Sequence, residues 1–143
     1  MSTLKESLLE VQGQIGKIVK TENNKFTKSK YESLDAVLDA ALPLLLTNGI
    51  LLTNTFIKDD GQLFYSTLFT KGDEELRVNF LVIIPPEHNN FAHLVASYST
   101  YGRRYNLKQA LNISTVDDDG VGAGAIKQGF IKKDNLEDFS TFI

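Results

Sequence analysis

A short segment in the second half of the chain concentrates side chains that bind polyanions. Tyr101, Arg104, Tyr105 and Lys108 are spaced three and four residues apart, which places them on one face of a helix, with Arg103 beside them. Guanidinium groups form planar forks that match phosphate oxygens and stack on bases. Tyrosine rings stack on any base, and each stacked base contributes about 1–3 kcal/mol to binding. The residue types and their spacing therefore predict a strip that binds single-stranded nucleic acid.

A second basic segment lies near the N-terminus, where lysines alternate with the aromatic residues Phe26 and Tyr31. It supplies a second wall of the same surface if the fold brings the two segments together. The candidate DNA-binding residues of both segments are Lys20, Lys25, Lys28, Lys30, Tyr31, Tyr101, Arg103, Arg104, Tyr105 and Lys108.

Core packing is the competing interpretation of the tyrosines. Tyr98, Tyr101 and Tyr105 continue a helical stripe that begins at Leu94, so Tyr98 is expected in the core and the other two are as well explained by packing as by binding. Arg104 is the strongest single candidate, because core packing explains a guanidinium within an aromatic strip poorly.

The distribution of charge supports a polyanion as partner, although the net charge is −3. Residues 1–31 carry a net charge of +3 and residues 101–116 another +3, whereas residues 32–100 carry −6 and residues 117–143 carry −3. Separated basic blocks of this kind matter more to a polyanion than the total charge. Taken alone, each block is also compatible with an ordinary solvated face.

No catalytic or metal-binding pattern is evident, and we expect neither an enzyme nor a cofactor. His88 and His93 are five residues apart, cysteine is absent, and neither a nucleophile elbow nor a phosphate-binding loop is present. The aspartates of residues 117–119 lack the spacing of a calcium loop and are interpreted as a solvated acidic turn.

Length and composition predict a single folded domain of about 120 residues followed by a tail. The 143 residues contain 42% hydrophobic and 23% charged residues, which is ordinary for a soluble protein. The absence of cysteine fits a reducing cytoplasm, and neither a secretory signal nor a membrane span is expected. We expect a domain over residues 1–120, and a flexible loop with a C-terminal tail over residues 121–143.

The periodicity predicts three helices around a sheet. One apolar stripe runs from Leu4 to Ile18, a polar loop rich in lysine follows, and a second helix begins near Leu34. Ser29 with Glu32 has the spacing of a capping box, and Ser33 is the alternative cap. Pro43 should kink or end this helix, and a stop signal follows at residues 48–49.

Three segments rich in β-branched and aromatic residues follow, at residues 50–57, 62–70 and 75–84, with short glycine-bearing turns between them. They predict an antiparallel β-meander, after which a helical period returns near Asn90. The fold class is therefore α+β, with helices packed on a three-stranded antiparallel meander that is followed by a long helix.

These residues resemble the ERF (essential recombination function) family of phage single-strand annealing proteins. The resemblance rests on Lys20, Asn24, Tyr31, Ser33 and Gly49, on the block Thr100-Tyr101-Gly102-Arg103-Arg104-Tyr105, and on Asp118-Asp119-Gly120. It covers residues 1–120 in the correct order. Gly102 stands where the family has alanine, and Tyr98 and Asn106 stand where smaller residues are expected.

The resemblance implies ATP-independent binding of single-stranded DNA and annealing of complementary strands during phage recombination. It also implies a β-β-β-α core whose sheet and long helix line a DNA groove, and assembly of copies into rings or filaments. Its further implications are a location in the cytoplasm of a bacterial host, and a phage exonuclease or a host single-strand binding protein as candidate partners.

The sequence leaves two other functions open. A protein that coats single strands of DNA or RNA without annealing them would present the same surface. A phage regulatory module would instead bind a protein through the acidic residues 59–75 or through the tail, whose last residues alternate acids with aromatic side chains.

Overall fold

The computed structural model describes residues 2–86 and 90–117. Its elements, in chain order, are α1 (Leu4–Gln14), β1 (Ile18–Lys20), β2 (Glu22–Asn23), β3 (Lys30–Tyr31), α2 (Leu34–Thr47), β4 (Leu51–Asp59), β5 (Gln62–Lys71), β6 (Glu74–Val82), α3 (Phe91–Leu111) and β7 (Thr115–Asp117). The glycine-rich loop, the tail, His88 and two of the three aspartates named above lie outside the described residues.

The meander β4-β5-β6 is antiparallel throughout, as predicted. Asp59 pairs with Gln62 and Lys71 pairs with Glu74, so each turn contains two residues. Gly61 and Gly72 have φ angles of 78° and 58°, which glycine adopts without steric cost. The glycines in the sequence therefore determine both the position and the tightness of the hairpins.

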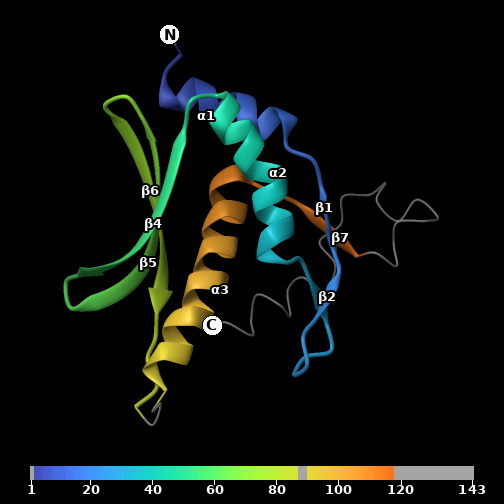
Figure 1. The fold of residues 1–143 in the computed structure, drawn as a ribbon, viewed down its shortest axis with the longest axis vertical. Helices are drawn as coiled ribbons and strands as arrows, with labels where there is room; N and C mark the ends of the chain where they lie inside the picture. The colour runs from blue at the N-terminus through green and yellow to red at the C-terminus, as the bar shows by residue number, and fades with distance from the viewer. Residues whose placement is uncertain (1, 87–89, 118–143) are drawn as a thin grey trace.

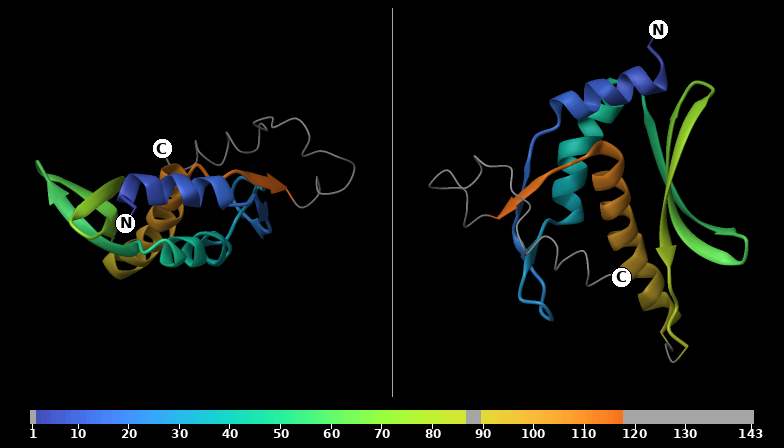
Figure 2. Two further views of the ribbon diagram at one scale, coloured as in Figure 1. Left: turned by 90° about the horizontal axis from the view of Figure 1, so that it is seen from above. Right: turned by 180° about the vertical axis from the view of Figure 1, so that it is seen from behind.

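The helices cover one face of this sheet (Figure 1). α3 packs on β5 and β6, α2 packs on α3, and α1 crosses the end of α2. The two further views in Figure 2 show the same arrangement, with the sheet on one side of α3 and α2 on the other. The core lies between these layers; its most buried side chains are Val11, Val37, Ala41, Leu45, Phe69, Leu107 and Leu111.

Two residues of α3 that depart from the family pattern account for its close contact with the sheet. A β-carbon at position 102 would lie only 2.8 Å from Tyr65 Cδ2 and 2.9 Å from Tyr65 Cβ, so glycine is required there. One turn later, the buried Asn106 donates through Nδ2 to the carbonyl of Tyr65 and to Thr67 Oγ1, each at 3.1 Å. Gly102 thus allows α3 to lie close to β5. The side-chain amide of Asn106 donates hydrogen bonds to polar groups of β5 that α3 covers.

The first helix is shorter than predicted, and the loop after it is partly ordered into strands. α1 ends at Gln14, and Ile18, which we assigned to its stripe, begins β1 instead. β1 pairs in parallel with β7, and β2 pairs with β3 in a small hairpin within the segment predicted as a loop. Strands of two or three residues carry too little periodicity to be distinguished from a loop.

The second helix begins at Leu34 with Ser33, the alternative candidate, as its cap. Ser33 Oγ accepts a hydrogen bond from the amide of Ala36 at 3.0 Å. The helix continues through Pro43 to Thr47, and Asn48 and Gly49 end it as predicted. Among the described residues, no helix is both long and apolar enough to cross a membrane.

Candidate nucleic-acid interface

The predicted strip on α3 meets the junction between β3 and α2. Tyr101, Arg104, Tyr105 and Lys108 lie on the side of α3 that contacts this junction, which supplies Tyr31. Tyr31 reaches α3 because the β2–β3 hairpin returns the chain to the start of α2. The fold therefore brings together the two basic segments that are separated by about 70 residues in the sequence.

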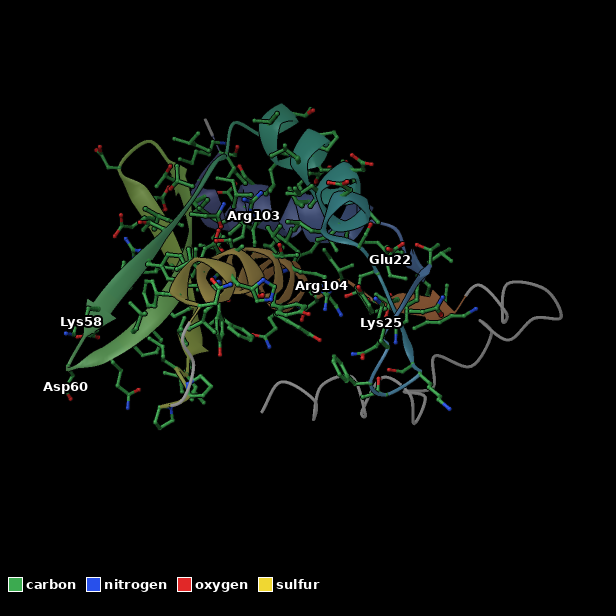
Figure 3. The ribbon with its side chains drawn as sticks, turned by 60° about the horizontal axis from the view of Figure 1, so that its bottom comes forward. Glu22, Lys25, Lys58, Asp60, Arg103 and Arg104 are labelled. Carbon is green, nitrogen blue, oxygen red and sulfur yellow. The ribbon has the colours of Figure 1, made fainter. Side chains whose placement is uncertain are left out.

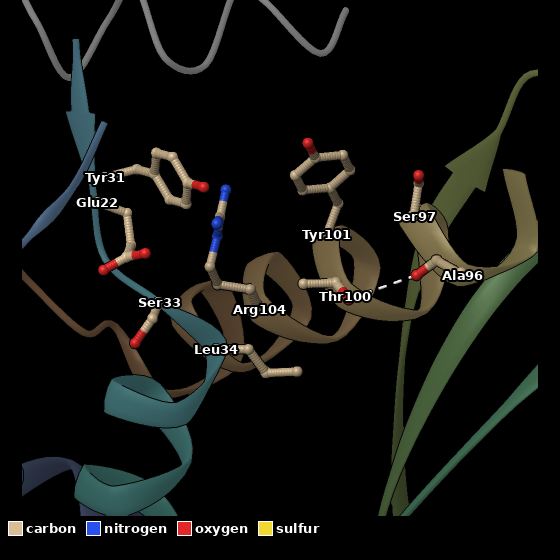
Figure 4. A pocket seen from close by; sticks show the side chains of 9 residues that line it. All are labelled: Glu22, Tyr31, Ser33, Leu34, Ala96, Ser97, Thr100, Tyr101 and Arg104. Atoms are coloured by element: carbon tan, nitrogen blue, oxygen red, sulfur yellow. Dashed lines mark hydrogen bonds between the residues drawn. The ribbon is translucent and has the colours of Figure 1, made fainter. Parts of the chain in front are cut away.

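Arg104 lies at the centre of a cage of three tyrosine rings. Its guanidinium carbon is 4.6 Å from the ring centroid of Tyr31, 5.1 Å from that of Tyr105 and 5.4 Å from that of Tyr101. In Figure 4 the guanidinium rises from α3 between Tyr31 and Tyr101. Planar guanidinium groups are suited to such stacking on aromatic faces.

Our expectation that core packing would explain Arg104 poorly is wrong. Only 1% of the residue is exposed, and Arg104 Nη1 donates to the carbonyl of Glu32 at 3.2 Å. Tyr105 is buried as well and stacks on Phe80 of the sheet, with ring centroids 5.8 Å apart. The cage therefore links the sheet, α3 and the β3–α2 junction, and Arg104 has a structural role whatever else it binds.

Glu32 is the acidic centre of this cluster, a role that the sequence did not suggest. It is 2% exposed, forms an ion pair with Lys108, and has its Oε1 atom 3.8 Å from Arg104 Nε. Lys20 is equally buried and close enough for its charge to act on Lys108. Arg104 and Lys108 thus share one carboxylate, with Lys20 nearby.

Burial within this cluster affects the titration of Lys108. Burial lowers the pKa of the Lys108 ammonium below its usual range, and the nearby charges of Arg104 and Lys20 lower it further. The ion pair and hydrogen bond with Glu32 act in the opposite direction. Lys108 is therefore held by its ion pair with Glu32 in a site where burial and two nearby cations oppose its charge.

A pocket of about 340 Å³ opens above Arg104 (Figure 4). The rings of Tyr31 and Tyr101 stand on either side of the guanidinium, and both tyrosines are half-buried. The remaining lining residues are Glu22, Ser33, Leu34, Ala96, Ser97 and Thr100. The Arg104 guanidinium occupies the space between these two rings, so a base can stack only on ring faces that it leaves open, with a phosphate near the cationic cluster.

The β2–β3 hairpin extends the basic surface from the edge of this pocket. Lys25 and Lys28 are exposed at its tip, and Lys30 is half-buried in β3. The tip is an ordered turn in which Asn24 Oδ1 accepts hydrogen bonds from the amides of Phe26 at 2.9 Å and Thr27 at 3.3 Å. The tip thus displays mobile, solvated cations on a defined backbone.

Arg103 is separated from the rest of the predicted set. Figure 3 shows Arg103 and Arg104 on different sides of α3, with Arg104 on the side of the hairpin that carries Glu22 and Lys25. Arg103 is half-buried, and its Nε atom has no hydrogen-bond partner within the described part of the chain. The adjacent arginines therefore cannot act as one pair, because one helical step turns them apart by about 100°.

The nine predicted residues other than Arg103 fall into three groups. Lys20, Arg104, Tyr105 and Lys108 form the largely buried cluster, Tyr31 and Tyr101 form the pocket walls, and Lys25, Lys28 and Lys30 lie on the hairpin. Tyr98, expected in the core, is half-buried, and its hydroxyl is within 3.1 Å of both the amide and the carbonyl of Ile83. Across residues 2–86 and 90–117, no group of three or more acidic or histidine side chains is placed to hold a metal.

The fold and the site together define an α+β domain with a β-β-β-α core and a basic, tyrosine-rich interface on the long helix. The family model of the ERF superfamily matches residues 4–135. The chain therefore belongs to the ERF superfamily. A search of curated proteins and a search of solved structures each find no significant match.

Membership of this family places the chain among proteins of phage recombination and single-strand annealing. Proteins of the family are annealing proteins rather than catalytic enzymes. The residues that carried the resemblance have different roles in the structure. Arg104 and Tyr105 hold elements together, whereas Tyr101 and Tyr31 line the pocket.

Proposed function

We propose that this protein binds single-stranded DNA and anneals complementary strands without nucleotide hydrolysis. The observation that carries the proposal is the tyrosine cage around Arg104, open to a pocket and continuous with a basic hairpin, in a chain of the ERF superfamily. Aromatic walls beside cations are the combination that binds single strands without regard to sequence.

The exposed residues make the contacts in this account, and the buried ones position them. Lys25 and Lys28 neutralise phosphates, and Tyr31 and Tyr101 offer faces on which a base stacks. Arg104, Lys108 and Lys20 lie beneath this surface and supply a positive potential. Arg104 is therefore a positioning residue, because its guanidinium fixes both ring walls and the start of α2.

Annealing needs no chemical step once the strand is held in this way. Contacts to phosphates position a strand while its base edges stay free to search for a complement. Duplex formation then supplies the driving force, with about 1.4 kcal/mol per base-pair step. The protein acts by concentrating and aligning strands.

A single copy offers a short contact surface, so we further propose that copies assemble into a ring or filament that aligns their interfaces. The acidic side chains of the meander turns, at residues 59–60 and 73–75, can then face away from the strand while basic surfaces of successive copies adjoin. A phage exonuclease or a host single-strand binding protein would deliver or receive the strand in the bacterial cytoplasm.

The hairpin lysines provide the test of the DNA-binding surface. Replacing Lys25→Ala together with Lys28→Asn should lower single-strand affinity and reduce the slope of log affinity against log salt by about 1.4, or about 0.7 per lost phosphate contact. Asparagine is chosen at position 28 because this residue has a φ of 60°. Fluorescence anisotropy with a labelled oligonucleotide across a salt series measures both quantities, with particle mass followed in parallel.

The matched control removes two other exposed lysines, Lys5→Ala in the first turn of α1 with Lys17→Ala after its end, neither of which lines the pocket. It changes the net charge by the same amount. Equal losses in the two variants would mean that the effect reflects overall charge, and the hairpin would be excluded as a specific contact.

A further inference from the structure

One large apolar side chain is displayed to solvent at the tip of the β2–β3 hairpin. Phe26 is 94% exposed, although burying such a ring is worth roughly 1.5–3 kcal/mol. The turn that holds it is ordered, because Asn24 accepts the Phe26 amide through its side chain and the Lys28 amide, at 2.8 Å, through its carbonyl. The Phe26 ring, held out on a defined turn, is a knob that is available for contact with another molecule.

A matching apolar cavity lies where the N-terminal end of α3 meets the sheet. It has a volume of about 230 Å³ and is lined by Phe56, Leu63, Val82, Ile84, Phe91, Leu94, Val95 and Tyr98. Tyr98 presents its ring there, because its hydroxyl is engaged by the backbone of Ile83. Phe91 is 60% exposed at the rim, so the cavity is accessible from solvent.

The charges around the knob and the cavity are complementary. Lys25 and Lys28 flank Phe26, whereas the turn of residues 58–60 beside the cavity carries two aspartates and one lysine. A net negative turn beside an apolar cavity repels a phosphate backbone and attracts a basic protein segment. The cavity therefore fits a protein knob with lysines around it better than it fits a nucleic acid.

The knob cannot fill the cavity of its own chain. Figure 3 shows Lys25 on one flank of the molecule, and Lys58 and Asp60 on the opposite flank. Contact between the two features thus requires a second copy, and the contact is heterologous, with different surfaces on each side. Repetition of a heterologous contact gives a ring if the rotation closes and a filament if it does not.

We propose that Phe26 of one copy inserts into the apolar cavity at the α3–sheet junction of the next copy. This inference rests on the assembly proposed above and names its contact surface. One phenylalanine buries about 150–250 Å², which is less than the roughly 1,200–2,000 Å² of a stable interface. Phe26 is therefore the anchor of a wider contact that includes the hairpin and the end of the sheet.

Two single variants remove one side of the contact each. Phe26→Ser removes the knob, and Phe91→Asp places a charge at the rim of the cavity. An aspartate at the first residue of α3 suits the helix N-terminus, so this variant should fold. Leu46→Ser on α2 is the control. Leu46 is an apolar side chain that is 59% exposed, close to the 60% of Phe91, and it belongs neither to the hairpin nor to the cavity lining.

Light scattering coupled to size exclusion measures the mass over a range of concentrations. We expect the wild type and Leu46→Ser to form the same multimer, and each contact variant to need at least about tenfold higher concentration to assemble. A mixture of Phe26→Ser and Phe91→Asp keeps one intact knob and one intact cavity. It should form a pair of twice the 15.9 kDa chain mass that neither variant forms alone.

Other outcomes overturn the inference in distinguishable ways. If the wild type assembles and Phe26→Ser assembles equally well, or if the mixture does not pair, the contact is wrong while the proposed annealing stands. If the Phe26→Ser variant forms a multimer of the wild-type mass but binds single strands more weakly, the Phe26 side chain stacks on DNA and not on a second copy. If the wild type is a single chain at all concentrations, the assembly itself fails, and DNA binding by that chain is measured separately.

Discussion

Arg104 and Arg103 are neighbours in the sequence with different environments in the fold. Arg104 is held by three rings, the carbonyl of Glu32 and the charge of its carboxylate, whereas Arg103 lies half-buried on another side of α3. The two arginines of the sequence motif therefore have different roles. Arg104 is structural, whereas the Nε atom of Arg103 has no hydrogen-bond partner among the described residues.

Replacing Arg104 by alanine should therefore destabilise the protein. Removal of one partner from a buried ion pair costs about 3 kcal/mol, and the rings of Tyr31 and Tyr101 lose the group between them. Arg103→Ala should cost less than about 1 kcal/mol. Urea unfolding of both variants measures the difference, and equal free energies of unfolding would contradict the structural role of Arg104.

The chemistry of the interface could be predicted from the sequence at this scale, but its burial could not. Tyr31, Tyr101 and the hairpin lysines are candidates because aromatic and basic side chains alternate there, and their contact with DNA stays a prediction. Glu32 was missed, and Lys20 is buried against expectation, because the cluster is assembled from β1, the β3–α2 junction and α3. The spacing of residues within one segment cannot predict that two other segments will enclose a charged side chain of that segment.

At the scale of elements, the contact between α3 and β5 positions the interface relative to the sheet. Gly102 permits this contact, since a β-carbon there would meet the buried Tyr65. Asn106, one turn later, adds hydrogen bonds to β5 in the same region. An alanine at position 102 would not fit here beside Tyr65.

Gly102→Ala should consequently lower stability, although alanine favours a helix by about 1 kcal/mol over glycine. The gain in helix propensity is outweighed by displacement of the Tyr65 side chain, for which overpacking typically costs 1–3 kcal/mol. Gly13→Ala is the control, because nothing lies within 4 Å of its β-carbon, and it should be neutral or stabilising. Thermal unfolding compares the two, and a stabilised Gly102→Ala variant would disprove the close contact.

The long elements were predictable and the short ones were not. The meander and the helices follow from sustained periodicity and from turn glycines with positive φ. The parallel pair β1–β7 and the hairpin β2–β3 depend on residues far apart or on turn chemistry at Asn24. β1 and β7 pair because the fold brings their distant segments together, and β2 and β3 pair because of the turn between them. Neither cause can be recognised in the periodicity of two or three residues.

For the whole molecule, the architecture separates two surfaces. The pocket above Arg104 and the basic hairpin form the surface assigned to DNA, and the apolar cavity lies at the far end of the sheet. The hairpin belongs to both accounts, because Phe26 inserts into the next copy while Lys25 and Lys28 can face either the strand or the acidic turn of residues 58–60. Binding of a strand and contact between copies would in that case share these two lysines.

The division into a domain of residues 1–120 and a tail of residues 121–143 stays a prediction, since residues 118–143 lie outside the described part. The same holds for the acidic turn and for a partner that binds the tail. These features do not enter the account of the interface, which depends only on residues that the structure describes.

The most direct test of the central claim is the annealing of two complementary labelled oligonucleotides without any nucleotide cofactor, followed by energy transfer over a series of salt concentrations. We predict that the protein accelerates annealing and that the acceleration falls steeply as salt rises. Binding of single strands without acceleration would contradict annealing and indicate a coating protein. Neither binding nor acceleration would contradict the account as a whole.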